Sequence, residues 1–368
     1  MVLHRSGIGW VSGRKAILPA LVGAAALLSA CGGSGSHRQM QAATVASAKP
    51  TAVRPATAHA RRAGGPGAGR GQLSPVQALV TAETENRLLV VELPSGRVVR
   101  RIAVAPDPED LATDGRGGVV AVVSSAAGKV TLLAGATFRP FKVIGGFGSP
   151  HIATIAPDDQ HVYVTDDARG TVTAINLFTL RRTSTIVVGA GAHHLSFDPW
   201  QNEAWVALGE SATTIVILDT SNYDQPRVIG RFEPGFPVHD VEFAPDAQQV
   251  WVTSSGGPDV SVFDPANRHV LFRVPVGAGP QHVAFDGRYA YLTSGYGGII
   301  ERVNASTGRI LDRAKSPYGS FELAADSRYV VTSSLLRGTL AIYTPQLKLI
   351  RIVRLAPATR EVAISSPT

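Results

Sequence analysis

Several features that a chain of this length often has are missing here. Cysteine occurs once, at Cys31, so no disulfide bond can form within the chain. The apolar stretch at residues 16–28 is shorter than the roughly 20 residues that a membrane-spanning helix needs. No segment after residue 75 combines the apolar period and the length of a helix, which favours an all-β fold.

The familiar motifs of hydrolytic enzymes are also missing. The chain holds no Gly-x-Ser-x-Gly elbow, no His-Glu-x-x-His pair and no nucleophilic cysteine in its globular part. Its glycine clusters lie in turns and precede no predicted helix, which excludes a phosphate-binding loop. A catalytic site would therefore have to be assembled from residues that are far apart in the sequence.

The first thirty residues have the pattern of an export signal. Basic residues between His4 and Lys15 precede the apolar stretch at 16–28, and Leu28-Ser29-Ala30-Cys31 follows it. This end resembles the lipobox of bacterial lipoproteins, which implies cleavage before Cys31 and acylation of that cysteine. A free thiol in an uncleaved segment is the alternative. The lipid would place the protein in the cell envelope, on the extracytoplasmic side of a membrane.

Residues 31–75 are rich in Ala, Gly, Pro, Ser and Arg and poor in large apolar residues, which predicts a flexible linker. The nine Lys and Arg before residue 76 have no Asp or Glu among them, which leaves 26 basic and 28 acidic residues for the remainder. The isoelectric point of about 9.7 therefore belongs to the N-terminal segment. A nucleic-acid partner is not expected for the globular part, whereas the linker cations favour an anionic membrane surface.

From residue 76 onward one pattern of about forty residues recurs. Its clearest copies begin at Pro150, Ala192, Val238 and Pro280, and weaker copies begin at Glu109 and Phe321. Self-similarity at this period is typical of repeat architectures such as propellers. Each copy contains short runs of β-branched and aromatic residues bounded by Gly, Asp, Asn or Pro, and four runs per copy predict four strands.

Four strands in each of seven repeats predict a seven-bladed β-propeller over residues 76–368. The first copy lacks an innermost strand, because only the polar linker precedes ALVTAE (78–83). Near its other end the chain has TREVAIS (359–365), which has the pattern of an innermost strand without a second strand after it. We expect this C-terminal strand to pair into the first blade and so to close the ring.

The strands HVYVT (161–165), QVWVT (249–253) and YAYLT (289–293) each follow a strand start that contains histidine. Residues 76–365 thereby resemble the YVTN-type β-propeller repeats, which implies the propeller fold. Relatives of this kind include binding proteins, lactonases, a streptogramin lyase and the copper-bearing propeller of nitrous oxide reductase. The copper site of that last relative calls for a nearly complete ring of histidines. Ile152, Asp240 and Glu322 interrupt such a ring here.

Two polar columns appear when the innermost strands are aligned on their apolar residue. One column contains Asp110, Ile152, His194, Asp240, His282, Glu322 and Glu361, and the preceding one contains Glu109, His151, His193, His239, Gln281, Phe321 and Arg360. Since the innermost strand of a propeller blade begins beside the central channel, both columns are expected to surround one channel mouth. Histidines and carboxylates that converge there suit metal binding or acid–base chemistry.

One interpretation of these columns is a divalent-metal site formed by His151, His193, His194, His239, Asp240, His282 and Glu322. Apart from such a metal, no cofactor is indicated. The columns could instead have a purely structural role or take part in catalysis. Ligand spacing does not separate these three roles, because the side chains come from different blades.

The loops between the second and third strands are expected at the same face. Asp166 and Asp167 would add carboxylates to a cation site, and Tyr296 and Arg337 would offer contacts to a ligand or partner. Asp110 and Glu361, from the first column, complete this predicted ligand face. Ordinary turn chemistry is the alternative role for the loop residues.

These features favour a lipid-anchored, extracytoplasmic propeller that acts as a binding or scaffolding module for an envelope protein or a small ligand. One alternative is a lactonase-like or lyase-like enzyme with a divalent metal at the channel mouth. Another is an envelope metal-binding protein. The chain is expected to be a monomer that contacts the membrane through its N-terminal lipid.

Overall fold

The computed structural model describes residues 76–365 apart from residues 115–117, 201, 210–211, 255 and 278. All of these residues belong to one compact unit, Ala68–Thr368. The predicted signal (1–30), the lipidation residue Cys31 and the predicted linker (31–75) lie outside the described residues. No helix in the described part of the chain is long and apolar enough to cross a membrane.

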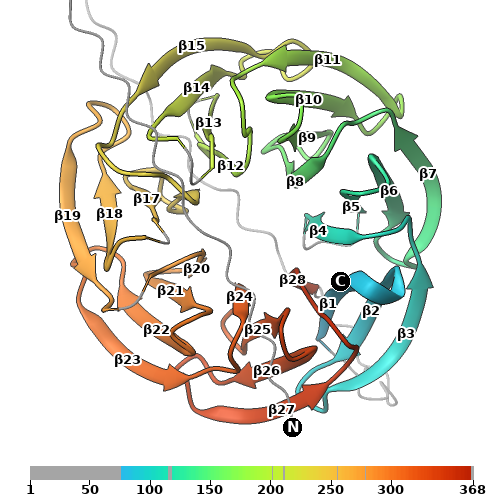
Figure 1. The fold of residues 1–368 in the computed structure, drawn as a ribbon, viewed down its shortest axis with the longest axis vertical. Coiled ribbons are helices and arrows are strands. Elements are labelled where there is room, and N and C mark those ends of the chain that lie inside the picture. The colour runs from blue at the N-terminus through green and yellow to red at the C-terminus, as the bar shows by residue number, and fades with distance from the viewer. Residues whose placement is uncertain are drawn as a thin grey trace, which may run out of the picture. The chain divides into compact units, whose positions relative to one another are not determined.

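Seven four-stranded antiparallel sheets surround a central axis in this unit (Figure 1). The first three blades consist of β28 (Val362–Ser365), β1 (Gln77–Ala82), β2 (Arg87–Glu92) and β3 (Arg97–Ala103); β4 (Pro108–Thr113), β5 (Val119–Ser124), β6 (Lys129–Ala134) and β7 (Arg139–Gly145); and β8 (Pro150–Ile155), β9 (His161–Asp166), β10 (Thr171–Asn176) and β11 (Arg181–Val187). A single 3₁₀ turn, η1 (Glu83–Glu85), joins β1 to β2.

The other four blades repeat this order from the axis outward. They consist of β12 (Leu195–Phe197), β13 (Glu203–Ala207), β14 (Ile215–Asp219) and β15 (Arg227–Phe232); β16 (Val241–Phe243), β17 (Val250–Val252), β18 (Asp259–Phe263) and β19 (Val270–Pro275); β20 (Val283–Asp286), β21 (Tyr289–Ser294), β22 (Ile299–Asn304) and β23 (Ile310–Lys315); and β24 (Ser320–Ala325), β25 (Val330–Ser334), β26 (Thr339–Tyr343) and β27 (Leu349–Arg354). The predicted all-β, seven-bladed propeller is confirmed.

The ring closes within the first blade, as the sequence predicted. The C-terminal strand β28 pairs antiparallel with β1, so that Val362 lies opposite Val80 and Ala363 lies opposite Leu79. The backbone N–H of Glu361 also donates to the hydroxyl of Thr81 at 2.8 Å. The first blade is therefore complete only when the C-terminal strand is in place.

The apolar core is divided among the interfaces between blades. Each of seven buried clusters joins two neighbouring blades, and the cluster that contains Leu79 and Val122 joins the first blade to the second. The large aromatic side chains of Trp205, Trp251 and Tyr291 are fully buried in such clusters. Because the closed ring carries all of its core inside itself, we expect Ala68–Thr368 to fold without the preceding segment.

Every outermost strand contains one β-bulge at a corresponding place. The extra residues are Val99, Phe141, Thr183, Ile229, Leu271, Leu311 and Ile350. A bulge increases the local twist and disturbs the hydrogen-bonding edge, so it discourages pairing with another chain. The outer rim is thereby protected although all of its strands are edges.

Candidate metal centre at the channel mouth

Threonine hydroxyls of the second strands hold the polar columns in place. The hydroxyl of Thr165 donates to the carbonyl of His193 in the next blade at 2.6 Å and accepts from the N–H of Ile152 in its own blade at 3.0 Å. Thr253 likewise donates to the carbonyl of Gln281 at 2.7 Å and accepts from the N–H of Asp240 at 3.2 Å. The threonine that ends the HVYVT and QVWVT strands therefore positions strand starts of two blades at once.

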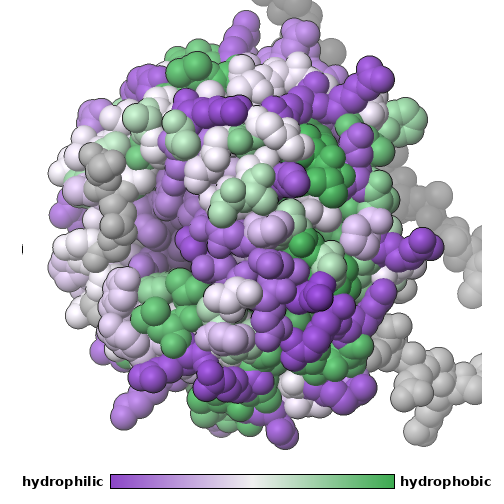
Figure 2. All heavy atoms as spheres, turned by 45° about the vertical axis from the view of Figure 1, so that its right-hand side comes forward, coloured by the Kyte–Doolittle hydropathy of each residue, from purple (hydrophilic) through white to green (hydrophobic). Residues whose placement is uncertain are grey.

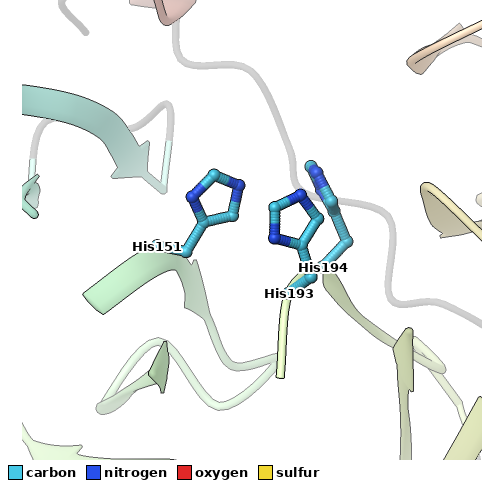
Figure 3. A group of neighbouring side chains, drawn as sticks. All are labelled: His151, His193 and His194. Atoms are coloured by element: carbon cyan, nitrogen blue, oxygen red, sulfur yellow. The ribbon is translucent and has the colours of Figure 1, made fainter. Parts of the chain in front are cut away.

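Five histidines gather where these strand starts meet. Their ring centroids lie between 3.8 Å (His151 and His193) and 5.8 Å (His193 and His239) apart wherever two of the rings are in contact. Two triplets bring their ligand atoms within 4.8 Å of one another, namely His151 with His193 and His194, and His194 with His239 and His282. Figure 3 shows the first triplet, whose rings lie together at the ends of neighbouring blades.

Carboxylates face the Nδ1 atoms of four of these histidines. The pairs are His151 with Glu109 at 3.2 Å, His193 with Asp167 at 3.0 Å, His194 with Asp240 at 3.3 Å and His282 with Asp240 at 3.5 Å. A carboxylate that takes the Nδ1 proton fixes the ring and leaves Nε2 as the electron-pair donor, which is the usual outer-shell arrangement of metal-binding histidines. This arrangement leaves the Nε2 atoms of His151, His193 and His194 as ligands. The Nε2 of His282 instead faces Glu322 at 3.0 Å.

His194 shows this arrangement most clearly. Its side chain is 93% buried, and its Nε2 atom has no hydrogen-bond partner among the described residues. Across the same mouth, the Nε2 atoms of His239 and His282 approach to 3.4 Å. A buried polar atom without a partner is rare in folded proteins, because its desolvation is not compensated. The position in front of His194 Nε2 is therefore a strong candidate for a bound ion.

The histidines carry unequal charge. Burial opposes a charge on His282, but Glu322, which lies 3.0 Å from its Nε2, and Asp240 outweigh that effect and raise the pKa of His282 to about 10. Burial lowers the pKa of His194 well below its usual value, and the neighbouring His282 adds to this effect. Burial beside His193 also lowers the pKa of His151 to about 3. At neutral pH His282 is therefore a cation between two carboxylates, while His194 and His151 are neutral.

The histidine layer separates two cavities along the channel. The outer cavity, of about 220 Å³, is lined by the histidines together with Tyr296, Phe321, Leu335 and Arg360. The inner cavity, of about 590 Å³, is lined by the carboxylates of Asp110, Asp240, Glu242, Glu322 and Glu361. His194, His282 and Glu322 line both cavities, so a ligand on either side reaches the same layer.

Burial raises the pKa of three carboxyl groups in the inner cavity. Burial raises the pKa of Asp110 to about 7, and the charge of Glu322 adds to this shift. Burial, together with Glu322 and Asp110, raises the pKa of Glu361 well above its usual value. Burial next to Asp240 raises the pKa of Glu242 to about 8. The lower channel therefore carries less negative charge at neutral pH than its composition implies.

The structure brings most of the predicted site residues together. All seven predicted metal residues surround the mouth, and Asp110 and Glu361 lie just below it. Tyr296 lines the outer cavity and packs edge-on against Phe321, with centroids 5.0 Å apart. Asp167 reaches the site through its contact with His193.

Two loop residues have other roles. Asp166 is buried and accepts from the backbone N–H groups of Gly148 at 2.6 Å and Ser149 at 3.0 Å, so turn chemistry accounts for it. Arg337 is exposed and does not line either channel cavity.

Sequence reasoning missed Glu242 and the pairing of the histidines with carboxylates. Glu242 stands two residues after Asp240, on the same side of its strand, so a third aligned column would have found it. No short sequence motif indicates the pairing of histidines with carboxylates, because Glu109 and His151 lie 42 residues apart on different blades.

Comparisons with known proteins agree with the fold. A family model described as the cytochrome D1 heme domain matches residues 115–230, which is under half of the chain. A functionally unknown protein from Desulfotomaculum acetoxidans DSM 771 superimposes with a TM-score of 0.70 at 16% identity, over 79% of this chain and 99% of its own. The hydrazine synthase of Kuenenia stuttgartiensis superimposes with a TM-score of 0.65 at 15% identity, over 77% of this chain and 100% of its own.

No curated protein matches this sequence. At such low identity the structural likenesses show the propeller fold and not its chemistry. The function has to be argued from the site itself.

Proposed function

We propose that this protein is an exported, lipid-anchored binding propeller of the YVTN type whose channel mouth binds a divalent transition-metal ion. The main support for a metal ion is the buried Nε2 of His194. This atom lacks a hydrogen-bond partner among the described residues, while Nδ1 of the same ring faces Asp240. A metal ion held by His194, His239 and His282 would satisfy this nitrogen.

The donor set indicates which ions the site would hold. His194, His239 and His282 offer three imidazole nitrogens, and Glu322 is the carboxylate next to His282. Imidazole with one carboxylate suits Zn²⁺, Cu²⁺ and Ni²⁺, and the described residues offer no thiolate or thioether that would favour a softer ion. The triplet of His151, His193 and His194 shares His194 and is more exposed, which favours the deeper triplet.

A haem group does not fit this mouth. The histidines contact one another, with ring centroids as close as 3.8 Å, so a flat macrocycle cannot pass between them. The outer cavity of about 220 Å³ also lies below the roughly 300–1,000 Å³ of typical small-molecule pockets. The likeness to the cytochrome D1 heme domain is therefore a likeness of fold, and we propose no haem chemistry here.

Metal analysis tests the proposal directly. Residues 68–368 should take up about one Zn²⁺, Cu²⁺ or Ni²⁺ per chain by elemental mass spectrometry, and the bound ion should raise the melting temperature. The double variant His194→Ala with His239→Ala should lose the ion and keep its circular dichroism spectrum. His269→Ala is the matched control, because His269 is exposed on the turn before β19. A domain that takes up no ion, or a double variant that retains it, would refute the proposal.

The inner cavity favours a second candidate, metal-assisted hydrolysis of a lactone or another small ester. Its volume of about 590 Å³ admits a small substrate beside the same histidines. Three imidazole ligands leave a position for water, and Glu322 would then act as the base instead of a ligand. A lactone panel assayed with and without a chelator tests this candidate. Glu322→Gln should keep the metal and lose the turnover.

A further inference from the structure

The outermost strands carry charge of almost one sign. Asp312 is the one carboxylate in these seven strands. Their cations are Arg97, Arg100, Arg101, Arg139, Lys142, Arg181, Arg182, Arg227, Arg231, Arg273, Arg313, Lys315, Arg351 and Arg354. The carboxylates of the innermost strand starts line the channel instead. The charges after residue 75 nearly balance in number, but they are separated in space, with cations on the outer wall and carboxylates along the axis.

Protection of strand edges accounts for only part of this pattern. Charged side chains and bulges both discourage an edge strand from pairing with another chain. Lysine is the usual residue for that purpose, whereas 12 of the 14 cations on these strands are arginine, so edge protection alone does not account for their choice. A cationic wall indicates an anionic partner.

Three neighbouring outer strands form a continuous sector of this wall. The guanidinium of Arg101 on β3 donates to the carbonyl of Leu355, just after β27, at 3.2 Å. The guanidinium of Arg100 donates to the carbonyl of Thr137, just before β7. Figure 1 shows β27, β3 and β7 following one another along the rim. The chain enters the propeller in the middle blade of this sector, since Val76 directly precedes β1.

Exposed apolar side chains lie among the cations of this sector. Phe141 and Val143 on β7 are 46% and 51% exposed, and Leu349, Ile350 and Ile352 on β27 are 53%, 40% and 47% exposed. Figure 2, which turns the side of the ring with β3 and β7 toward the viewer, shows hydrophilic and hydrophobic residues side by side.

The cations beside these apolar residues are available to a partner. The structure pairs none of Arg139, Lys142, Arg351 and Arg354 with a carboxylate among the residues that it describes. Cations interleaved with exposed apolar side chains are the composition of surfaces that lie on anionic bilayers.

We propose that the wall sector formed by β27, β3 and β7 docks onto an anionic phospholipid surface. Its cations attract the headgroups, and its exposed apolar side chains enter the interfacial layer. The N-terminal segment joins the propeller at Val76 in this sector, so a flexible linker would reach this wall over a shorter distance than the opposite one. The docking goes beyond metal binding and depends neither on a bound ion nor on acylation of Cys31.

Vesicle sedimentation with residues 68–368, which lack Cys31, tests this docking. The protein should bind phosphatidylcholine vesicles only when they contain phosphatidylglycerol, and the binding should weaken as salt is added. The variant R139Q/K142Q/R351Q/R354Q should bind at least about tenfold more weakly. R181Q/R231Q/R268Q/R273Q removes as many cations from the third to fifth blades, where Val187, Ile229 and Leu271 are also exposed. It should bind more tightly than the sector variant, because β11, β15 and β19 carry five cations and β27, β3 and β7 carry seven. An equal loss of vesicle affinity in both variants would refute the assignment of docking to this sector.

A second pair of measurements separates a bilayer from a soluble polyanion. F141S/I350S should lose the part of vesicle binding that survives high salt, because that part comes from apolar contact. Inorganic polyphosphate should bind more weakly than the vesicles do. If polyphosphate binds as tightly and F141S/I350S changes nothing, the wall recognises a linear polyanion and the membrane proposal is wrong. Thermal unfolding confirms that each variant is folded.

Discussion

At the scale of single residues, the centre of the site is a cation between two acids. His282 lies 3.0 Å from Glu322 and 3.5 Å from Asp240, and its pKa of about 10 means that it holds its proton at neutral pH. A metal ion that takes its Nε2 must displace this proton, since imidazole binds metals in its neutral form. We therefore expect metal affinity to increase with pH.

The His282 ion pair also makes a prediction about stability. His282→Ala leaves two buried carboxylates without their cation and should cost about 3–5 kcal/mol of unfolding free energy near pH 6. The pKa of His282 is higher in the folded than in the unfolded state, so its contribution is full below about pH 6.5 and is lost as the pH rises toward 10. Urea unfolding between pH 6 and pH 10 measures this. If His282→Ala lost the same unfolding free energy at every pH in this range, the raised pKa of His282 would be wrong.

Asp110 should show the opposite pH dependence. Its pKa of about 7 lies above the unfolded value, so the unfolded chain ionises first and stability decreases from about pH 4 to pH 7. Asp110→Asn removes this penalty and should be about 2–4 kcal/mol more stable than the wild type at pH 8. An asparagine oxygen can still accept from the N–H of Ala153, which Asp110 contacts at 2.6 Å. Denaturation curves of Asp110→Asn and the wild type measure this difference. An equal gain in unfolding free energy at pH 4 and at pH 8 would disprove the raised pKa.

At the scale of elements, the strands could be predicted from the sequence, but the β-bulges could not. The β-branched runs and the leftover strand at 359–365 were sufficient to predict the blades and the closure, because each strand shows its burial in its own residues. The seven bulges have no such signal, since Phe141 and its equivalents differ from their neighbours only in pairing register. The positioning role of Thr165 was also invisible, because its partner His193 belongs to the next blade.

The closing strand β28 should decide whether the propeller folds cooperatively. Deleting residues 359–368 exposes β1 as an inner edge and opens the cluster around Val362, which is 1% exposed. We expect the deleted chain to lose its single thermal transition and to aggregate. A synthetic peptide of residues 359–365 should restore the transition by adding the missing strand. Val362→Ala keeps the strand and should keep one transition at a lower temperature. A deleted chain that melts like the wild type would contradict this role of β28.

At the scale of the whole molecule, the residues at the central axis and those at the outer rim differ in chemistry and in proposed role. The axis gathers histidines and carboxylates at one mouth, and the rim carries the cations and the bulges. Aligning the repeats predicted the ring of site residues because blades repeat and a repeated position keeps its place around the axis. The protonation of that ring could not be predicted, since it depends on how deeply His194 and Asp110 are buried and on which neighbours face them.

Anomalous scattering from a crystal of residues 68–368 grown with Zn²⁺ tests the metal site most directly. We predict one strong zinc peak at the channel mouth, about 2.0–2.1 Å from the Nε2 atoms of His194, His239 and His282. The same crystal form of His194→Ala should lack that peak. A mouth without zinc, with peaks only at exposed histidines such as His269, would contradict the account.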